Sequence, residues 1–291
     1  MKEMRRLLFH MQHCRGLGLK GTRLLLARLS DPSLIYELSP VSIQQLSQST
    51  AVNAKLFHTD LHTLPIREYE ENYRRNSIQW VSLYDEDYPE LLKNVYDPPF
   101  ILFMKGKKEL LKSRIKLAVI GSRQATSYTE EILREMMPGL AEKNIVIVSG
   151  LARGADTAAH KMAIRSGGIT IGVVAGGFQH IYPRENSKLA DYMMKNQLLL
   201  SESPPFIKPQ KWQFPFRNRI ISGISNAVLV TEAQKKSGTF ITADYALNEG
   251  REILCIPGSI HHKLSEGTNI LIKDGAKMVL SIEDIFSELD V

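Results

Sequence analysis

The sequence predicts an α/β fold in which a small all-helical domain precedes a doubly wound, largely parallel sheet. From Lys116 onward, short apolar runs rich in β-branched residues alternate with helical patterns, which is typical of strands covered by helices on both faces. Glycine-rich loops follow several of these runs. Residues 1–70 instead place apolar residues at helical spacing. We therefore divide the chain into domains 1–70 and 71–291.

Composition and charge favour a globular protein with an anionic partner. The 291 residues are 43% hydrophobic and carry a net charge of +6, which favours nucleic acid. No apolar run approaches the roughly 20 residues of a membrane helix, and the N-terminus has no signal-peptide pattern. Cys14 and Cys255 are the only cysteines, too far apart for a thiolate metal site and suited to a reducing compartment. We expect a cytoplasmic protein with no membrane partner, metal or cofactor.

The first domain contains a glycine turn between two predicted helices. Helical patterns cover Met4–Gln12 and Thr22–Leu29, and Gly16-Leu17-Gly18 lies between them. The arrangement resembles a helix-hairpin-helix, whose turn can meet a DNA phosphate through backbone N–H groups. A plain tight turn between packed helices explains the same residues, so both interpretations stay open.

A connecting stretch leads into the sheet. We predict strands at Trp80–Leu83 and Phe100–Gly106, with a short helix opening at Tyr88 between them. Six cations, the first Lys105 and the last Lys116, then follow within twelve residues, and we interpret them as a solvated face. The remaining strands are predicted at residues 117–120, 145–148, 169–174, 198–200, 227–230 and 252–256, and helices at 156–165, 217–225 and 239–248.

The loops after these strands carry the candidate phosphate contacts. In a parallel sheet, ligands bind beyond the carboxyl ends of the strands, and glycine N–H groups near helix N-termini attract phosphate. Arg123 adds a fixed positive charge directly after the strand that ends at Ile120. The candidates from these loops are Gly121, Ser122, Arg123, Ser149, Gly150, Arg153, Gly154, Gly176, Gly177, Gly238 and Thr239.

Two common phosphate signatures are absent from the sequence. No loop matches the Walker A pattern, which argues against ATP hydrolysis of the P-loop type. No loop after a strand has the Gly-x-Gly-x-x-Gly spacing, which argues against ordinary dinucleotide binding.

The segment from Lys208 to Arg219 interleaves cations with aromatic residues. This mixture suits single-stranded nucleic acid, because cations meet phosphates and aromatic faces stack on bases. Alternatively, the aromatic residues cover the core and the arginines pair within the fold. We assign Phe216 to the core, and Lys211 and Phe214 to the ligand because they precede the predicted helix. The candidates from this segment are Lys211, Phe214, Arg217, Asn218 and Arg219.

Several motifs together resemble the DNA processing protein A family (DprA, also called Smf) over about residues 80–280. They are Asp97-Pro98-Pro99, Lys105-Gly106, Gly121-Ser122-Arg123, Ser149 to His160, Tyr182-Pro183, Phe214 to Gly223, Ser237-Gly238-Thr239 and Glu266 to Asn269. The resemblance implies a SAM-like helical domain followed by an extended Rossmann domain. It implies a homodimer that binds single-stranded DNA and loads RecA onto it during natural transformation.

The resemblance also assigns roles to individual residues. It places Arg123, Lys211 and Phe214 in the DNA pocket. Some family members add a C-terminal winged-helix domain, and since this sequence ends at Val291 we expect it to lack one.

A nucleotide-cleaving enzyme is the alternative. The predicted fold resembles that of phosphoribohydrolases carrying Pro-Gly-Gly-x-Gly-Thr-x-x-Glu, but Thr242 stands where that glutamate would fall. A hydroxyl cannot replace a carboxylate in acid–base catalysis near neutral pH. Asp156 and His160 lie four residues apart on a predicted helix, and we interpret them as an N-cap and a packed helix residue. We predict a binding protein, not an enzyme.

Overall fold

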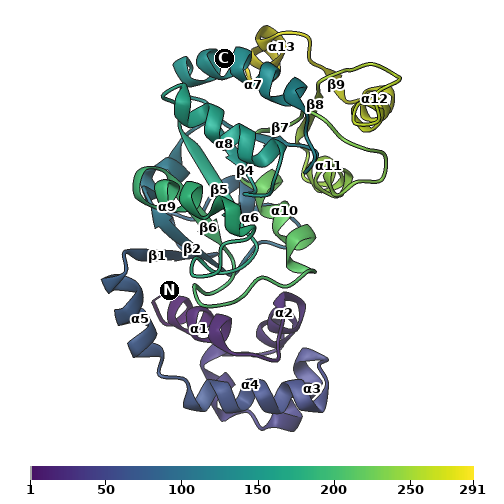
Figure 1. The fold of residues 1–291 in the computed structure, drawn as a ribbon. Coiled ribbons are helices and arrows are strands. Elements are labelled where there is room, and N and C mark those ends of the chain that lie inside the picture. The colour runs from purple at the N-terminus through teal and green to yellow at the C-terminus, as the bar shows by residue number, and fades with distance from the viewer. Residues whose placement is uncertain (1) are drawn as a thin grey trace. The chain divides into compact units, whose positions relative to one another are not determined.

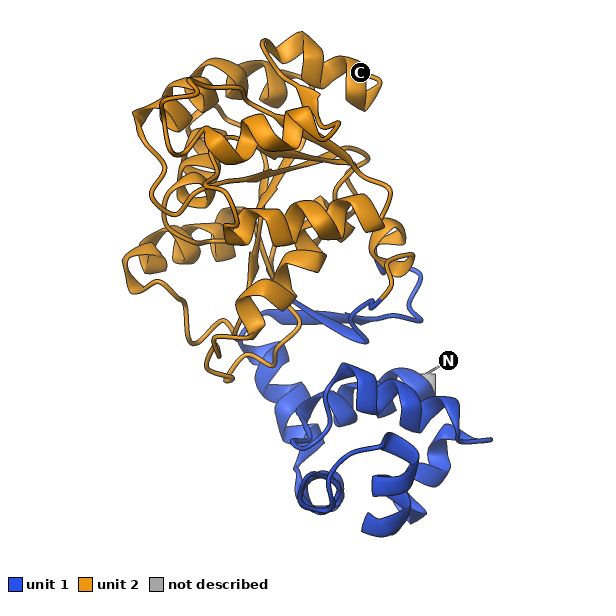
Figure 2. Ribbon diagram, turned by 90° about the vertical axis from the view of Figure 1, so that its right-hand side faces the viewer, with its two compact units in different colours: residues 1–88, 97–103 blue, residues 89–96, 104–291 orange. Residues whose placement is uncertain are grey.

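The computed structural model describes residues 2–291, which form two compact units (Figure 2). The first unit comprises residues up to Tyr88 together with Asp97–Phe103, and the second comprises Pro89–Tyr96 and Met104–Val291. The division predicted at residue 70 falls inside a helix, α5 (Ile66–Arg75), and the first unit continues beyond it. Within the described residues, no helix is both long and apolar enough to span a bilayer.

The first unit is a set of short helices around its own apolar core (Figure 1). Leu25, Ile35, Ile43 and Phe57 are fully buried in that core. Side chains that accept backbone N–H groups start three of the helices. Besides α5, the helices are α1 (Lys2–His13), α2 (Leu19–Ala27), η1 (Pro32–Glu37), α3 (Pro40–Ser47) and α4 (Ala51–Thr63).

The glycine turn before α2 is packed against α4. Gly16 has a φ of +92°, and a Cβ there would lie 2.2 Å from the carbonyl oxygen of Asn53. Next to it, Arg15 donates to the Asp60 carboxylate from its backbone N–H at 2.8 Å and from its guanidinium at 2.7 and 2.8 Å. Close packing within the unit therefore accounts for Gly16 without a DNA phosphate.

The second unit contains a sheet in the order β6-β5-β4-β3-β7-β8-β9, with every neighbouring pair parallel. This order confirms the predicted doubly wound α/β class, because the chain reverses direction across the sheet at β3. The strands are β3 (Lys116–Ile120), β4 (Val146–Ser149), β5 (Thr170–Val174), β6 (Leu198–Ser201), β7 (Ala227–Val230), β8 (Glu252–Cys255) and β9 (Lys277–Met278). Two further strands, β1 (Ile78–Ser82) and β2 (Ile101–Gly106), begin in the first unit.

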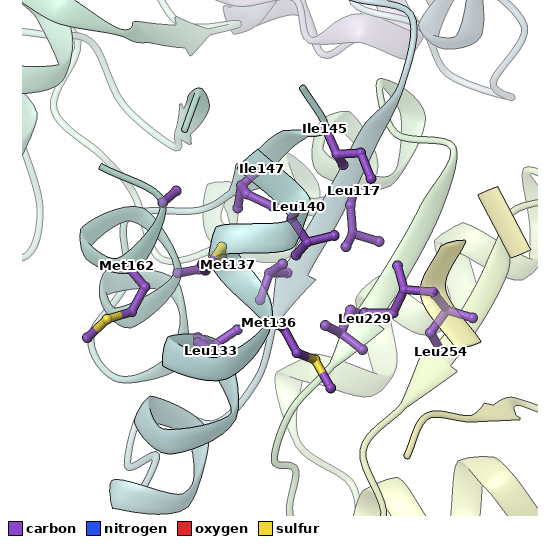
Figure 3. Packing of buried hydrophobic residues seen from close by; sticks show 14 of the residues in the cluster. Leu117, Leu133, Met136, Met137, Leu140, Ile145, Ile147, Met162, Leu229 and Leu254 are labelled. Atoms are coloured by element: carbon purple, nitrogen blue, oxygen red, sulfur yellow. The ribbon is translucent and has the colours of Figure 1, made fainter. Parts of the chain in front are cut away.

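Helices cover this sheet (Figure 1). The main core lies where α7, α8 and α13 pack on alternate residues of β3, β4 and β7, including Leu117, Ile147 and Leu229 (Figure 3). Two other helices, α10 and α11, pack against each other and against β5, β7 and β8. The elements of this unit are α6 (Glu90–Lys93), η2 (Lys108–Lys112), α7 (Ser127–Glu142), α8 (Ala155–Arg165), η3 (Arg184–Asn186), α9 (Ser187–Asn196), α10 (Gln213–Gly223), α11 (Gly238–Asn248), α12 (Glu266–Lys273) and α13 (Ile282–Leu289).

Helix α10 starts four residues before the predicted position. We expected a helix from Arg217, with Phe214 in the loop before it, whereas the helix begins at Gln213. Pro215 is the third helical residue, where the missing N–H costs nothing because first-turn N–H groups have no intrahelical acceptor. Phe214 is therefore held on the first turn of a helix.

Both units contain buried histidines, and His13 and His160 have the two most strongly lowered pKa values among them. The Nδ1 of His13 donates to the Phe9 carbonyl at 2.7 Å, and its Nε2 accepts from the Tyr73 hydroxyl at 2.7 Å. In the second unit, His160 pairs through Nδ1 with the Thr170 hydroxyl at 2.7 Å. Burial lowers the pKa of both histidines to about 4.

These histidines predict a loss of stability in acid. The unfolded chain takes up a proton on each histidine near pH 6.5, whereas the folded protein does so only near pH 4. The contribution of these histidines to the stability is therefore fully present above pH 6.5 and is lost as the pH drops from 6.5 to 4. Between pH 7 and 4.5, H160N should lose about 2–3 kcal/mol less free energy of unfolding than the wild type. Urea unfolding at both pH values measures this, with the exposed His261 replaced as H261N for control. Identical pH dependence in wild type and H160N would contradict the assignment.

Candidate functional site

A cavity of about 600 Å³ lies at the carboxyl ends of the central strands. Its lining comes from the loops after β3, β4, β5 and β7 and from the first turns of α10 and α11. The predicted residues that line it are Gly121, Ser122, Arg123, Arg153, Phe214, Arg217, Asn218, Gly238 and Thr239. The predicted residues outside its lining are Ser149, Gly150, Gly154, Gly176, Gly177, Lys211 and Arg219.

The turn after β3 is held by Glu232, which follows β7 and is 1% exposed. The Glu232 carbonyl accepts the Ser122 N–H at 2.7 Å, and its carboxylate accepts the Thr126 N–H at 2.7 Å. The hydroxyls of Thr126 and Thr129 donate to the same carboxylate at 2.9 and 2.8 Å. The Thr126 N–H at the start of α7 and the Ser122 N–H thus already have acceptors within the protein. The expectation that this backbone receives a phosphate is therefore wrong for Ser122.

Glycines in the loops after β3 and β4 allow close packing between those loops. A Cβ on Gly121 would lie 2.6 Å from the Thr231 hydroxyl, and one on Gly154 would lie 2.3 Å from the Ser122 carbonyl oxygen. A Cβ on Gly150 would lie 2.3 Å from an Asp156 carboxylate oxygen. These glycines bring the loops together and so shape the cavity. Ser149 is buried, and its hydroxyl donates to the Val119 carbonyl at 2.6 Å.

The Gly176-Gly177 pair is also packed inside the protein. A Cβ on Gly177 would lie 2.2 Å from the carbonyl oxygens of Pro204 and Pro205, and the Gly177 N–H donates to Ile207 at 2.8 Å. A Cβ on Gly176 would lie 2.7 Å from Pro209. The predicted phosphate contact at Gly177 is therefore corrected, because its N–H already has an acceptor.

The floor of the cavity carries a buried charged pair of residues, Asp156 and Arg217, each 8% exposed. Arg217 donates to the Val173 carbonyl. Burial raises the pKa of Asp156 and lowers the pKa of Arg217, while the charge of each residue opposes the shift of the other. Asp156 accepts the Ala152 N–H at 3.2 Å, and Gly154 is the N-cap of α8, so the expected N-cap role of Asp156 is wrong.

Arg219 lies inside the fold. Only 2% of its side chain is exposed, Nη2 contacts both Glu202 oxygens at 2.6 and 2.7 Å, and the guanidinium lies 4.0 Å over the Phe216 ring. The predicted DNA contact at Arg219 is therefore replaced by a buried ion pair. The alternative left open in the sequence, in which arginines of this segment pair within the fold, describes Arg219 correctly.

The rim of the cavity brings together a cation and two aromatic rings. The Arg123 guanidinium carbon lies 6.0 Å from the Phe214 ring centroid, and the Tyr182 ring meets Phe214 edge-on with centroids 5.4 Å apart. Arg123 and Tyr182 are exposed and Phe214 is half-buried. Lys211 is also exposed, just before α10. This rim can therefore offer a positive charge and a ring face to a ligand.

Several lining residues were not chosen from the sequence. They include Gln124, Tyr182, Gln234 and Ser237. Tyr182 belongs to the Tyr182-Pro183 motif, so the signal was present but gave no role. Ser237 likewise belongs to the Ser237-Gly238-Thr239 motif, whereas Gln124 and Gln234 have ordinary polar side chains without a distinguishing pattern. Among residues 2–291, no group of three or more His, Cys, Asp or Glu side chains is arranged to hold a metal ion.

Two glycine variants separate packing from ligand contact. G177A should lose about 1–3 kcal/mol of unfolding free energy, because the new Cβ meets rigid backbone oxygens. G238A should keep the wild-type stability, because no atom lies within 4 Å of its Cβ position although Gly238 lines the cavity. Urea unfolding measures both. A G177A protein as stable as the wild type would contradict the packing described for this loop.

Comparison with known proteins identifies the family. A family model described as DNA recombination-mediator protein A matches residues 79–290. The DNA processing protein DprA of Bacillus subtilis is 49% identical over 217 residues, which are 75% of this chain and 73% of that protein. The protein Smf of Escherichia coli is 42% identical over 205 residues, which are 70% of this chain and 54% of Smf.

Two solved structures agree with this match. The X-ray structure of DprA from Streptococcus pneumoniae is 36% identical, covers 98% of both chains and gives a TM-score of 0.85. DprA from Helicobacter pylori, whose single-stranded DNA binding mode has been described structurally, is 31% identical and covers 72% of this chain and 95% of its own, with a TM-score of 0.66. The resemblance seen in the sequence motifs is confirmed: the chain belongs to the DNA recombination-mediator protein A family, whose members are also named DprA or Smf.

Proposed function

We propose that the cavity binds single-stranded DNA, with a base on Phe214 and a backbone phosphate on Arg123. The observation that carries this proposal is the exposed Arg123 guanidinium facing the half-buried Phe214 ring at the rim of the cavity. Ring faces bind unstacked bases, and a guanidinium binds phosphate oxygens. The DNA-binding mode described for the Helicobacter pylori relative supports the same ligand.

The N-terminus of α11 supplies a second place for phosphate. Gly238 and Thr239 start this helix and line the cavity, and its first turn contains no acidic residue. The starts of α7 and α8 differ, because Glu232 and Asp156 bring carboxylates to them. Of these three helix starts, α11 is therefore the one we assign to phosphate. Lys211 extends the positive charge beyond the cavity.

This pocket should discriminate against duplex DNA. A base can stack on Phe214 only when it has left its neighbours in the strand, and duplex bases are already paired and stacked. Stacking on a ring face and phosphate binding by a guanidinium do not depend on a particular base edge. We therefore expect binding with little sequence preference.

The family membership supports a wider role in recombination. We propose that the protein acts as a cytoplasmic homodimer that loads RecA onto single-stranded DNA during natural transformation. Two pockets in one dimer would raise the apparent affinity for strands long enough to reach both.

A nucleotide-cleaving activity has one observation in its favour. Asp156 lies on the cavity floor, and burial raises the pKa of its carboxyl, which is a common property of catalytic acids. However, Arg217 opposes that rise, Thr242 lines the cavity where the comparable enzymes carry glutamate, and His160 is fully buried behind the floor. We therefore expect no turnover.

Incubation with AMP tests the enzymatic alternative. The protein should release no adenine above the rate of a protein-free blank, because the cavity lacks the glutamate that would activate water. Chromatography of the free base measures this. Steady adenine release that D156N abolishes would replace the binding proposal with a hydrolase.

Substitutions at Arg123 and Phe214 test the pocket itself. R123A should weaken oligo-dT binding about tenfold and reduce the slope of log K against log salt by about 0.7, because one phosphate contact is lost. F214A should weaken binding by about 1–3 kcal/mol with an unchanged salt slope, because stacking releases no counterion. Gel shifts across a salt series measure both effects. The exposed Arg165, at the end of α8 far from the cavity, gives the matched control R165A. Wild-type affinity in R123A and F214A would contradict the pocket assignment.

A further inference from the structure

One cation of the cavity wall is held by a carboxylate that the proposed function does not use. Arg153, in the loop after β4, lines the cavity and contacts Glu185 of η3. Its Nε donates to Oε1 at 2.8 Å and its Nη2 contacts Oε2 at 2.8 Å. Both side chains are more than half exposed, at 62% and 53%. A negative charge thus lies beside a site that we assign to an anion.

Hydrogen bonds join the two chain segments that carry Arg153 and Glu185. Asn186, which follows Glu185, is only 4% exposed, and its amide donates to the Leu151 carbonyl and the Thr157 hydroxyl at 2.8 Å each. The Thr157 hydroxyl in turn donates to the Ala152 carbonyl at 2.6 Å. The loop that carries Arg153 and the turn that carries Glu185 are therefore fixed to each other. Glu185 stays beside Arg153 even though both side chains reach solvent.

The contact occupies the part of Arg153 that would receive a phosphate. A guanidinium binds carboxylate and phosphate with the same pair of parallel N–H groups. Glu185 takes Nε and Nη2, so it fills one such pair and neutralises the charge. We infer that Glu185 competes with a DNA phosphate for Arg153 and thereby lowers the affinity of the cavity for single-stranded DNA. This inference rests on the proposed function.

The exposure of the pair limits the size of this effect. Exposed ion pairs contribute little in water, since solvent and salt screen them. A strand can therefore displace Glu185 at a small cost. When it does, the freed carboxylate takes up a cation, and binding releases fewer counterions in total. Glu185 consequently tunes the affinity and the salt dependence without closing the site.

Removing the carboxylate charge tests this competition. E185Q should bind oligo-dT about threefold more tightly than the wild type at low salt, and the gain should shrink as salt rises, because one more positive charge is available. R153A should remove the gain, so that R153A/E185Q binds no more tightly than R153A. Gel shifts across a salt series measure all three variants.

The control removes the same charge far from the cavity. Glu142 is exposed at the end of α7 opposite the cavity, about 24 Å along this 16-residue helix, so E142Q should leave binding unchanged. Unchanged or weaker binding by E185Q, or a gain that persists in R153A/E185Q, would overturn the inference. R123A and F214A separate a failure of the competition from a failure of the proposed function. If they still weaken binding when E185Q has no effect, the proposed function stands and only the competition fails.

Discussion

The site depends on the buried carboxylate of Glu232. It accepts the Thr126 N–H at the start of α7, and the Glu232 backbone carbonyl accepts the Ser122 N–H, so the turn after β3 is tied to the loop after β7. Arg123 therefore projects from a fixed backbone next to Phe214. The same carboxylate offsets the partial positive charge at the N-terminus of α7. The charge offered at this part of the rim is consequently that of the Arg123 side chain.

Charged side chains have different roles at the floor and at the rim of the cavity. Arg217 and Arg219 are buried, with Asp156 and Glu202 respectively providing negative charge nearby, and they stabilise the packing of α10. Arg123 and Arg153 are exposed, and only their exposure allows exchange with a ligand. Separating a buried guanidinium from its carboxylate is unfavourable, because an unpaired buried charge costs several kcal/mol. The proposed DNA contacts therefore belong to the rim.

The strands of the sheet could be predicted well, because β-branched apolar runs and helical periodicity are local features that can be read directly from the sequence. The sequence predicted the start of α10 poorly because Pro215 looks like a boundary and is harmless in a first helical turn. It also could not separate phosphate-binding glycines from packing glycines. The acceptor of the Gly177 N–H is Ile207, and the group facing Gly154 is the Ser122 carbonyl, so both partners are distant in sequence. Arg217 and Arg219 were ambiguous for the same reason. Arg123 was identified as a cation directly after a strand and Phe214 as an aromatic residue among cations. The motif resemblance gave both the same role, and the structure places them together.

The structure of the protein with a short oligo-dT bound tests the central claim most directly. We predict one thymine base stacked on the Phe214 ring and a phosphate oxygen within hydrogen-bond distance of the Arg123 guanidinium. We also predict that the Glu232 carboxylate keeps its contacts with Thr126 and Thr129. An oligonucleotide bound elsewhere on the protein, with no base or phosphate at Arg123 and Phe214, would contradict the account.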